Sequence, residues 1–295
     1  VLVINESTSF PGTLRNYIKP AINKYSKNPL EHLYAISPER VDPGRGDYNK
    51  RNTPRLFAGL TPEASTKTRE FYSKFCDQLI EVSSPEVAEA AKLFENTFRQ
   101  VNIALVNEFA QIAHSLGISV YETLDAANTK PYGFMKFTPS AGVGGHCIPV
   151  DPLYLTWWAQ QQGCSVELVE SADSINLAMP KYVAHRALNL VESTITNPKV
   201  LILGVAYKAG VADVRETPVS ALRDYLKVKG ATVAWHDPLV PIWEETNPVS
   251  LDWDCDVAIL ATNQPGIDFM RLVRRNIPIL DCTNSIQNLA GVIRF

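Results

Sequence analysis

Short apolar runs separated by polar turns open the chain and indicate an α/β arrangement. Residues 1–4 and 32–36 are apolar runs of strand length. A helical pattern covers 61–77, and a possible third strand follows at 78–82. The Gly- and Pro-rich segment 42–46 predicts a loop.

The longest helical pattern begins near Ser83 and runs to Leu116, where Gly117 provides a stop. Ser83 and Glu86 have the spacing of a capping box. The pattern is about 32 residues long, or ~48 Å. A helix of this length typically joins two lobes or forms a dimer interface, so we expect a homodimer through helix 83–117. Its apolar positions are Val87, Ala91, Phe94, Phe98, Val101, Leu105, Phe109, Ile112 and Leu116.

The second half of the chain changes from helices to alternating strands and helices. Helices are predicted at about 151–162 and 179–194, and a further helix opens at Thr217 and closes at Gly230. This alternation indicates a parallel sheet covered by helices. We expect domains at 1–82, 83–197 and 198–295. The predicted strands of the last domain are 200–204, 232–236, 257–260 and 277–280.

Composition narrows the classes of function. Lys plus Arg is 28 and Asp plus Glu is 31, so the formal charge is 28 − 31 = −3, which disfavours nucleic acid as a partner. No apolar run approaches the ~18–20 residues of a membrane span, so we expect no membrane contact. The five cysteines are odd in number and scattered, which favours a reducing compartment, expected to be the cytoplasm. The five histidines lack ligand spacing, so no metal site is expected.

The segment 142–152, GVGGHCIPVDP, is the strongest candidate for chemistry. It nearly matches a dinucleotide fingerprint, but no strand precedes it and the third Gly is missing. Gly144 and Gly145 instead suit a backbone that approaches a ligand closely. Asp151 is expected to cap the next helix, whose dipole would favour the thiolate of Cys147. The alternatives are a buried structural cysteine and an aspartate that only caps. The other four cysteines are expected in the core.

Polar residues on the long helix form a second candidate group. Lys92, Asn96 and Arg99 share one face at i, i+4 and i+7. The ordinary interpretation is a solvated face. The functional one is a lysine and an amide that stabilise a developing oxyanion.

Two strand ends and one loop carry further candidates. Glu39 follows the second strand and is either a general base or a surface residue paired with Arg40. Lys208 and Arg215 lie in a long loop before a helix, where they hold a pyrophosphate or form a solvated ion pair. The residues Glu6, Ser7 and Thr8 occupy the end of the first strand.

These motifs together resemble the UDP-glucose/GDP-mannose dehydrogenase family along essentially the whole chain. They are EST…PGT at 6–13, SPER at 37–40, EAAKLFENTFRQVNIALVNE at 89–108, GVGGHCIPVDP at 142–152 and LGVAYKAGVADVRETP at 203–218. The resemblance implies an NAD-binding Rossmann domain, a central region around one long helix and a C-terminal Rossmann-like domain that holds the nucleotide. It also implies oxidation of the C6 alcohol of a nucleotide sugar to a carboxylate, with NAD as the cofactor.

The resemblance also implies roles at matching positions. Cys147 would form a thioester with the substrate, and Lys92 and Asn96 would lie near the oxyanion. Asp151 would work with the lysine and a water. Glu39 would assist thioester hydrolysis, and the Thr8 hydroxyl would hold the water. Cofactor contacts would come from Glu6, Ser7 and Arg215, and substrate contacts from Arg40, Lys208, Gly144 and Gly145.

Three motifs narrow the expected substrate within the family. SPERVDPG at 37–44, TKPYGF at 129–134 and CIPVDP at 147–152 look like the branch that acts on UDP-N-acetylglucosamine or its galacto epimer. The UDP-N-acetylmannosamine branch, typically with HPR and CIAVDP, is the alternative, followed by UDP-glucose. A different class, a non-catalytic nucleotide-sugar-binding dimeric module, also remains open.

Two departures from the family pattern change what we expect. None of the 15 glycines forms GxGxxG, and the chain opens inside a strand without Met. We therefore expect a fragment that contains only a remnant of the Rossmann domain and is inactive alone. In addition, Thr283 stands where many members have an Arg, which weakens the inference at the uracil end.

Overall fold

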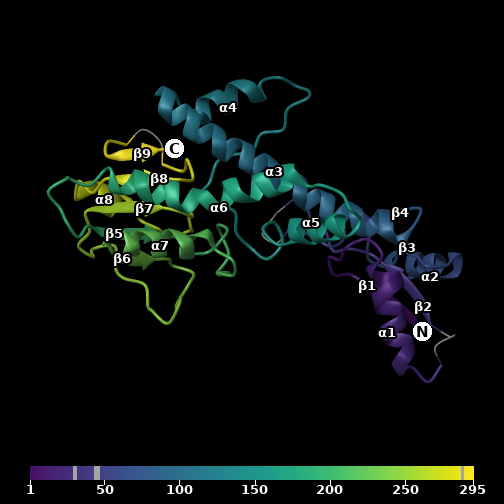
Figure 1. Ribbon diagram of the computed structural model, residues 1–295. Helices are drawn as coiled ribbons and strands as arrows, with labels where there is room; N and C mark the ends of the chain where they lie inside the picture. The colour runs from purple at the N-terminus through teal and green to yellow at the C-terminus, as the bar shows by residue number, and fades with distance from the viewer. Residues whose placement is uncertain (29–31, 43–46, 287–288) are drawn as a thin grey trace. The chain divides into compact units, whose positions relative to one another are not determined.

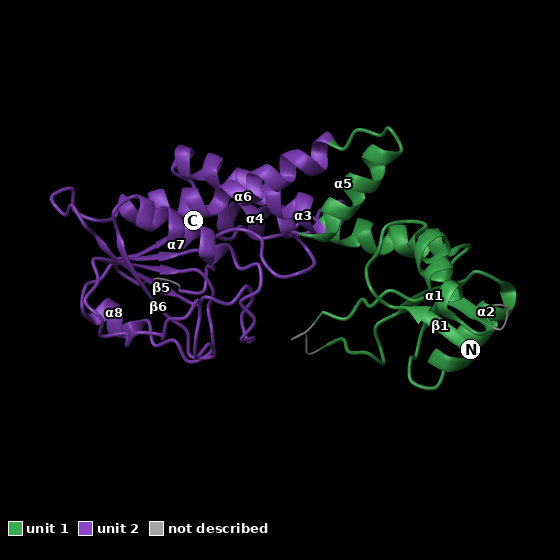
Figure 2. Ribbon diagram, turned by 60° about the horizontal axis from the view of Figure 1, so that its bottom comes forward, with its two compact units in different colours: residues 1–98, 150–166 green, residues 99–149, 167–295 purple. Residues whose placement is uncertain are grey.

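The computed structural model describes residues 1–28, 32–42, 47–286 and 289–295, so the loop predicted at 42–46 falls mostly outside the described residues. The chain forms two compact units, which Figure 2 shows in different colours. Unit 1 contains residues 1–98 and 150–166, and unit 2 contains residues 99–149 and 167–295.

Unit 1 is built on a four-stranded sheet (Figure 1). Its strands are β1 (Leu2–Asn5), β2 (Leu33–Ile36), β3 (Arg55–Gly59) and β4 (Leu79–Glu81), in that order across the sheet. The pairs β1–β2 and β3–β4 are parallel, whereas β2–β3 is antiparallel. Sequence analysis missed β3, because this strand begins with a charged residue, Arg55, whose side chain is nevertheless buried.

Helices cover the sheet of unit 1. A π-helical turn at Leu14–Ile18 continues into α1 (Lys19–Tyr25). The next helix, α2 (Pro62–Tyr72), begins where the Thr61 hydroxyl accepts a bond from Ala64 N at 3.2 Å. Another, α5 (Asp151–Gln161), joins this unit from later in the chain.

The long helix is confirmed as α3 (Pro85–Leu116). Its first 14 residues belong to unit 1 and the rest to unit 2. The predicted cap is wrong by one position, because the Ser84 hydroxyl, not that of Ser83, accepts a bond from a first-turn N–H at 3.4 Å. Glu86 does not complete a capping box, since its carboxylate pairs with Arg15 at 2.7 Å.

The predicted apolar positions of α3 largely face outward. Phe94 and Leu105 are 67% and 60% exposed, and Leu116 is 66% exposed. Small and polar side chains instead make up most of its buried side, which includes Ala88, Leu93, Asn96, Thr97, Gln100, Ala104, Asn107, Ala110 and Ala113. Buried polar groups generally need hydrogen-bond partners, and Asn96, Thr97 and Asn107 of α3 have them.

Two further helices of unit 2 were predicted incompletely. The helix α4 (Val120–Asn128) was not predicted, and α6 (Glu167–Leu188) begins twelve residues before the predicted 179–194 helix. Pro180, one residue after the predicted start at Met179, lies inside α6 and is buried. Propensity alone would end a helix there, but packing of both its halves in unit 2 sustains it.

Unit 2 contains the predicted parallel sheet, with one strand more than expected. Its order is β6–β5–β7–β8–β9, and every neighbouring pair is parallel (Figure 1). Helices α7 (Pro218–Val228) and α8 (Met270–Arg274) complete the unit. The strands are β5 (Lys199–Leu203), β6 (Thr232–His236), β7 (Val257–Leu260), β8 (Ile279–Asp281) and the unpredicted β9 (Val292–Arg294).

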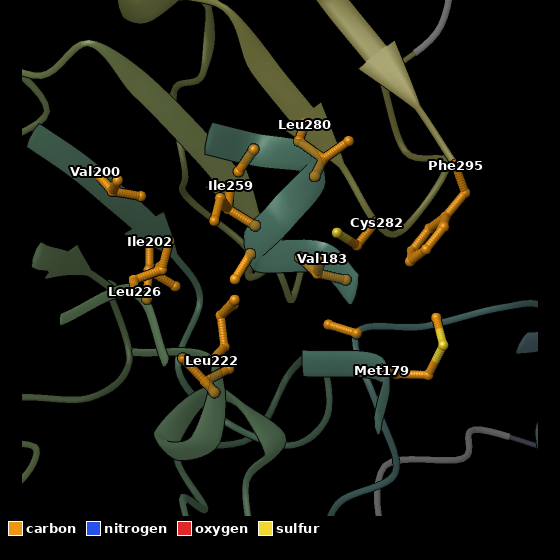
Figure 3. Packing of buried hydrophobic residues seen from close by; sticks show 14 of the residues in the cluster. Met179, Val183, Val200, Ile202, Leu222, Leu226, Ile259, Leu280, Cys282 and Phe295 are labelled. Carbon is orange, nitrogen blue, oxygen red and sulfur yellow. The ribbon is translucent and has the colours of Figure 1, made fainter. Parts of the chain in front are cut away.

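Both faces of this sheet are apolar, as expected for parallel strands covered on two sides. Ile202 and Ile259 belong to the larger cluster, with Leu222 and Leu226 of α7 and Val183 of α6 (Figure 3). The other face packs in a second cluster that includes Leu201, Leu203, Ala258, Leu260 and Leu272. The carboxyl ends of β5 and β8 are thereby fixed, and the loops of the candidate site follow from them.

Candidate functional site

In unit 1, α3 and α5 share a buried polar pair. Asn96 Nδ2 donates to Asp151 Oδ2 at 2.5 Å, and these residues are 5% and 3% exposed. Asp151 is the first residue of α5 rather than its cap, which is Val150. The solvated interpretation is therefore wrong for Asn96. It holds for the exposed Arg99, whereas Lys92 is half-buried.

Glu89 is a residue that sequence reasoning missed. Its carboxylate accepts the N–H groups of Gly12 at 2.6 Å and Leu14 at 2.9 Å, together with the Ser9 hydroxyl at 3.3 Å. Burial raises the pKa of Glu89, and the N–H donors partly offset that effect. Its spacing from the lysine and asparagine of α3, three and seven residues, was the available signal. The segment after β1, which carries Thr8, is thus tied to the same helix.

A second missed residue, Arg55, connects the two strand-end glutamates. Its guanidinium contacts Glu6 at 2.5 Å and Glu39 at 3.3 Å, and it donates to the Ser37 hydroxyl at 3.0 Å. Tyr72 lies under it, with the ring centre 4.3 Å away, and donates its own hydroxyl proton to Glu6. Burial, aided by this bond to Glu6, raises the pKa of Tyr72, so the phenol stays a donor at neutral pH.

Arg40 does not pair with Glu39, contrary to the alternative considered for that glutamate. Its guanidinium contacts Glu95 at 2.8 Å and donates to the carbonyl of Pro54 at 2.7 Å. The Arg40 backbone N–H does bind the Glu39 carboxylate, at 2.9 Å. The predicted contact of Arg40 with substrate stays a prediction.

In unit 2, buried amides position the start of the glycine loop. Asn107 of α3 accepts the Ser140 N–H at 2.9 Å and donates to Asn176 of α6 at 3.0 Å. Asn176 in turn donates to the carbonyl of Gln100 at 3.1 Å. These bonds pair the buried amides of Asn107 and Asn176, and they hold the start of the loop against α3 and α6.

The glycines of this loop are needed for packing against protein. At Gly144 a Cβ would come within 2.7 Å of Pro218 and 2.8 Å of Tyr207. Gly145 has φ +87°, and a Cβ there would lie 2.9 Å from the Tyr207 ring. The close approach expected of a ligand is thus made by Tyr207 and Pro218. Contact of the two glycines with substrate stays a prediction.

All five cysteines are thiols rather than disulfides, and Cys147 differs from most of them in its surroundings. Cys147 is half-buried, whereas Cys76, Cys255 and Cys282 are buried. Burial raises the pKa of these three thiols, that of Cys255 to about 11. The prediction that the other four lie in the core is wrong for Cys164, which is exposed.

The loop after β5 carries Lys208 and Arg215. Arg215 pairs with Asp213 at 2.6 Å, and this bond lowers the pKa of Asp213 to about 2. Lys208 is half-buried. Two buried side chains fix the loop: Asp237 accepts the Val205 N–H at 2.9 Å, and Gln264 accepts the Gly210 N–H at 2.7 Å.

Thr283 follows β8 and turns inward to its own strand. Its hydroxyl donates to Asp281 at 2.7 Å, and its N–H binds the same oxygen at 2.8 Å. Asp281 is fully buried and also accepts the Ile286 N–H at 2.8 Å. Thr283 therefore stabilises the turn after the strand and supplies no charge there.

The predicted site residues divide between the two units. Unit 2 holds Gly144, Gly145, Cys147, Lys208 and Arg215. Within the described ranges, no helix is long and apolar enough to cross a membrane, and no cluster of His, Cys, Asp or Glu could hold a metal. Unit 1 holds Glu6, Ser7, Thr8, Glu39, Arg40, Lys92, Asn96 and Asp151.

An NAD pyrophosphate does not fit the residues present. A dinucleotide cradle needs a glycine-rich turn between a strand and a helix. The turn after β1 has Gly12 alone, and its N–H is already bound to Glu89. The sequence contains no GxGxxG motif.

Comparison with known proteins agrees with this arrangement. Residues 86–178 match the central domain of the UDP-glucose/GDP-mannose dehydrogenase family, and residues 201–288 match its UDP-binding domain. The structure of UDP-D-ManNAc dehydrogenase from Pyrococcus horikoshii is similar with a TM-score of 0.87 and 31% identity, covering 100% of this chain and 72% of that one.

Two curated relatives differ in the sugar that their names give. UDP-N-acetyl-D-mannosamine dehydrogenase of Methanococcus aeolicus is 38% identical over 245 residues, which are 82% of this chain and 54% of that protein. UDP-N-acetyl-D-glucosamine 6-dehydrogenase of Pseudomonas aeruginosa is 36% identical over 245 residues, 81% of this chain and 58% of the relative. The chain thus spans little more than half the length of either. With two domain matches and a shared fold along its whole length, the chain belongs to the UDP-glucose/GDP-mannose dehydrogenase family.

Proposed function

We propose that the full-length protein oxidises the C6 alcohol of a UDP-N-acetylhexosamine to a carboxylate through a thioester on Cys147. The observation that carries this proposal is the setting of Cys147. It is half-buried at the end of a loop packed on Tyr207, in the unit that contains the match to a UDP-binding domain. A thiol in that setting is open to a bound sugar, unlike the sealed Cys255 and Cys282.

The chain's own residues would act on the carbonyl carbon of the substrate. Cys147 adds to the aldehyde, and the family resemblance implies that Lys92 and the Asn96 amide stabilise the oxyanion. A covalent link retains the aldehyde between the two oxidations. Members of this family use NAD as the acceptor of two hydrides, but the residues of this chain provide no pyrophosphate cradle, so NAD binding is a proposal for the full-length protein.

The mannosamine epimer is the substrate that we propose first. UDP-N-acetylmannosamine enzymes are similar at 38% identity in sequence and at TM-score 0.87 in structure. The motif-based expectation placed the gluco or galacto epimer first, and the 36% identical glucosamine enzyme supports it as the second candidate.

The test is product formation by the full-length protein with each UDP-N-acetylhexosamine and NAD. We expect the wild type to form two NADH per uronic acid. We expect Cys147→Ser to form no uronic acid, because a serine hydroxyl cannot form the thioester. Cys164→Ser is the matched control, since Cys164 is exposed. Uronic acid formed by Cys147→Ser at the wild-type rate would contradict the assignment.

We also propose a homodimer through helix 83–117 and a cytoplasmic location. The exposed apolar residues of α3 support the first. Five cysteines that form no disulfide in the structure support the second.

A further inference from the structure

We propose that Arg55 is the positioning residue that aims the Glu39 carboxylate during thioester hydrolysis. This inference rests on the proposed function, in which Glu39 assists that step. It concerns only unit 1, where Arg55, Glu6, Glu39 and Tyr72 form one connected group.

All three guanidinium nitrogens of Arg55 donate hydrogen bonds. Nη2 contacts Glu6 at 2.5 Å, and both Nη atoms lie 3.3 Å from Glu39 Oε2. Nε donates to Ser37 at 3.0 Å, and Ser37 donates to the carbonyl of Leu56 at 2.9 Å, which belongs to the same strand. The side chain is 9% exposed. Planar, multidentate binding of this kind fixes orientation as well as charge.

Glu39 is held at both carboxylate oxygens. Oε2 faces Arg55, while Oε1 accepts the N–H groups of Arg40 at 2.9 Å and Val41 at 2.8 Å. The side chain nevertheless stays 43% exposed. A carboxylate held in this way has a fixed orientation, as a base that must meet a single water molecule requires.

Other charged and titratable groups near Glu39 do not replace Arg55. Glu6 is a second carboxylate, and Tyr72 is a neutral donor already bound to Glu6. Cys76 is a thiol kept protonated by burial, with both glutamates in its electrostatic surroundings. The guanidinium of Arg40 is bound to Glu95. Without Arg55 the two glutamates would repel each other across a partly buried space, and Glu39 would turn toward solvent.

Hydrolysis of the thioester is the step that depends on this arrangement. Water adds its oxygen to the thioester carbon, forming a C–O bond, and its proton passes to Glu39. The C–S bond then breaks, and the electron pair leaves with the sulfur of Cys147 as thiolate. The products are the carboxylic acid, which ionises, and the free enzyme.

The test compares full-length wild type with Arg55→Met by intact mass spectrometry after mixing with substrate and NAD. We expect the variant to accumulate an acyl adduct on Cys147 and to release uronic acid at least about tenfold more slowly, as for loss of a group that assists proton transfer. The initial burst of NADH should remain, because the oxidations precede hydrolysis. A merely structural role would lower the burst and the hydrolysis rate together.

The matched control is Arg69→Met. Arg69 also lies over a ring, that of Phe57 at 5.0 Å, and pairs with Glu81 at 2.7 Å, but it contacts neither strand-end glutamate. It should behave as wild type. If Arg55→Met fails to fold, Arg55→Lys is the second test. Lysine retains the positive charge but lacks the planar guanidinium, so this variant should still accumulate the acyl adduct.

Turnover without adduct in a folded Arg55 variant overturns the positioning role and leaves the proposed function intact. Wild type that forms neither NADH nor uronic acid from any UDP-N-acetylhexosamine overturns the proposed function itself.

Discussion

At Gly145 the absence of a Cβ allows the loop that carries Cys147 to lie against Tyr207. The backbone there has φ +87°, a conformation that side chains disfavour, and a Cβ would come 2.9 Å from the ring. Steric contact and backbone strain therefore act at the same position, which makes this glycine more demanding than one in an open turn.

We expect Gly145→Ala to lower the free energy of unfolding by about 2 kcal/mol. Gly210→Ala is the control, because Gly210 has φ +77° with nothing within 4 Å of a Cβ, so it isolates the cost of the backbone alone, about 1 kcal/mol. Thermal and urea unfolding measure both. Equal losses in the two variants would show that the Tyr207 contact imposes no steric cost.

The Asp213–Arg215 pair makes the loop after β5 sensitive to acid. Arg215 lowers the pKa of Asp213 from 3.8 to about 2, so the pair contributes stability above about pH 4 and loses it as pH falls through about 2. The contribution is small, since 65% of the Arg215 side chain is exposed. We expect the unfolding temperatures of wild type and Asp213→Asn to converge between pH 4 and 2. A constant difference over that range would exclude the linkage.

At the scale of elements, α3 displays an apolar stripe outward and buries amides inward. Leu105 and Phe94 are 60% and 67% exposed, while Asn96 and Asn107 have buried partners. An apolar stripe of this length on a helix whose own core contacts are otherwise satisfied is typical of an interface.

We therefore expect Leu105→Glu to convert a dimer into a monomer, because two copies of a carboxylate would be desolvated at a symmetric interface. Sedimentation velocity measures the change. Val228→Glu, at an 82% exposed position of α7, should leave assembly unaffected. A wild type that sediments as a monomer at all concentrations, or a Leu105→Glu dimer, would contradict the α3 interface.

The same element shows where local pattern stops being informative. Its length and its end at Gly117 were predicted correctly, since apolar periodicity and a C-terminal glycine are local signals. Its cap and the direction of its faces were not. Ser83 and Ser84 are adjacent residues of the same type, so the sequence does not show which hydroxyl caps the helix. In the structure it is that of Ser84.

At the scale of the whole molecule, the sequence identified most strands of unit 2 because they are short apolar runs with clear breaks. It missed β3, β9, α4 and α8, and it began α6 at Met179 rather than at Glu167. Each miss combines a weak local signal with strong tertiary support. A buried arginine begins β3, and a proline within α6 is tolerated where Met179, Val183 and Ala184 beside it are buried in the core.

The α/β class, the long helix, the parallel sheet of unit 2 and the motifs of the family resemblance could all be predicted from the sequence, since they depend on neighbours along the chain. Only the tertiary structure decided that Arg55 joins Glu6 to Glu39, that Glu89 holds the turn at Gly12, and that Asn96 binds Asp151. These partners lie between 16 and 77 positions apart. A buried charge or amide must find a partner wherever folding brings one, and no local pattern records which one that is.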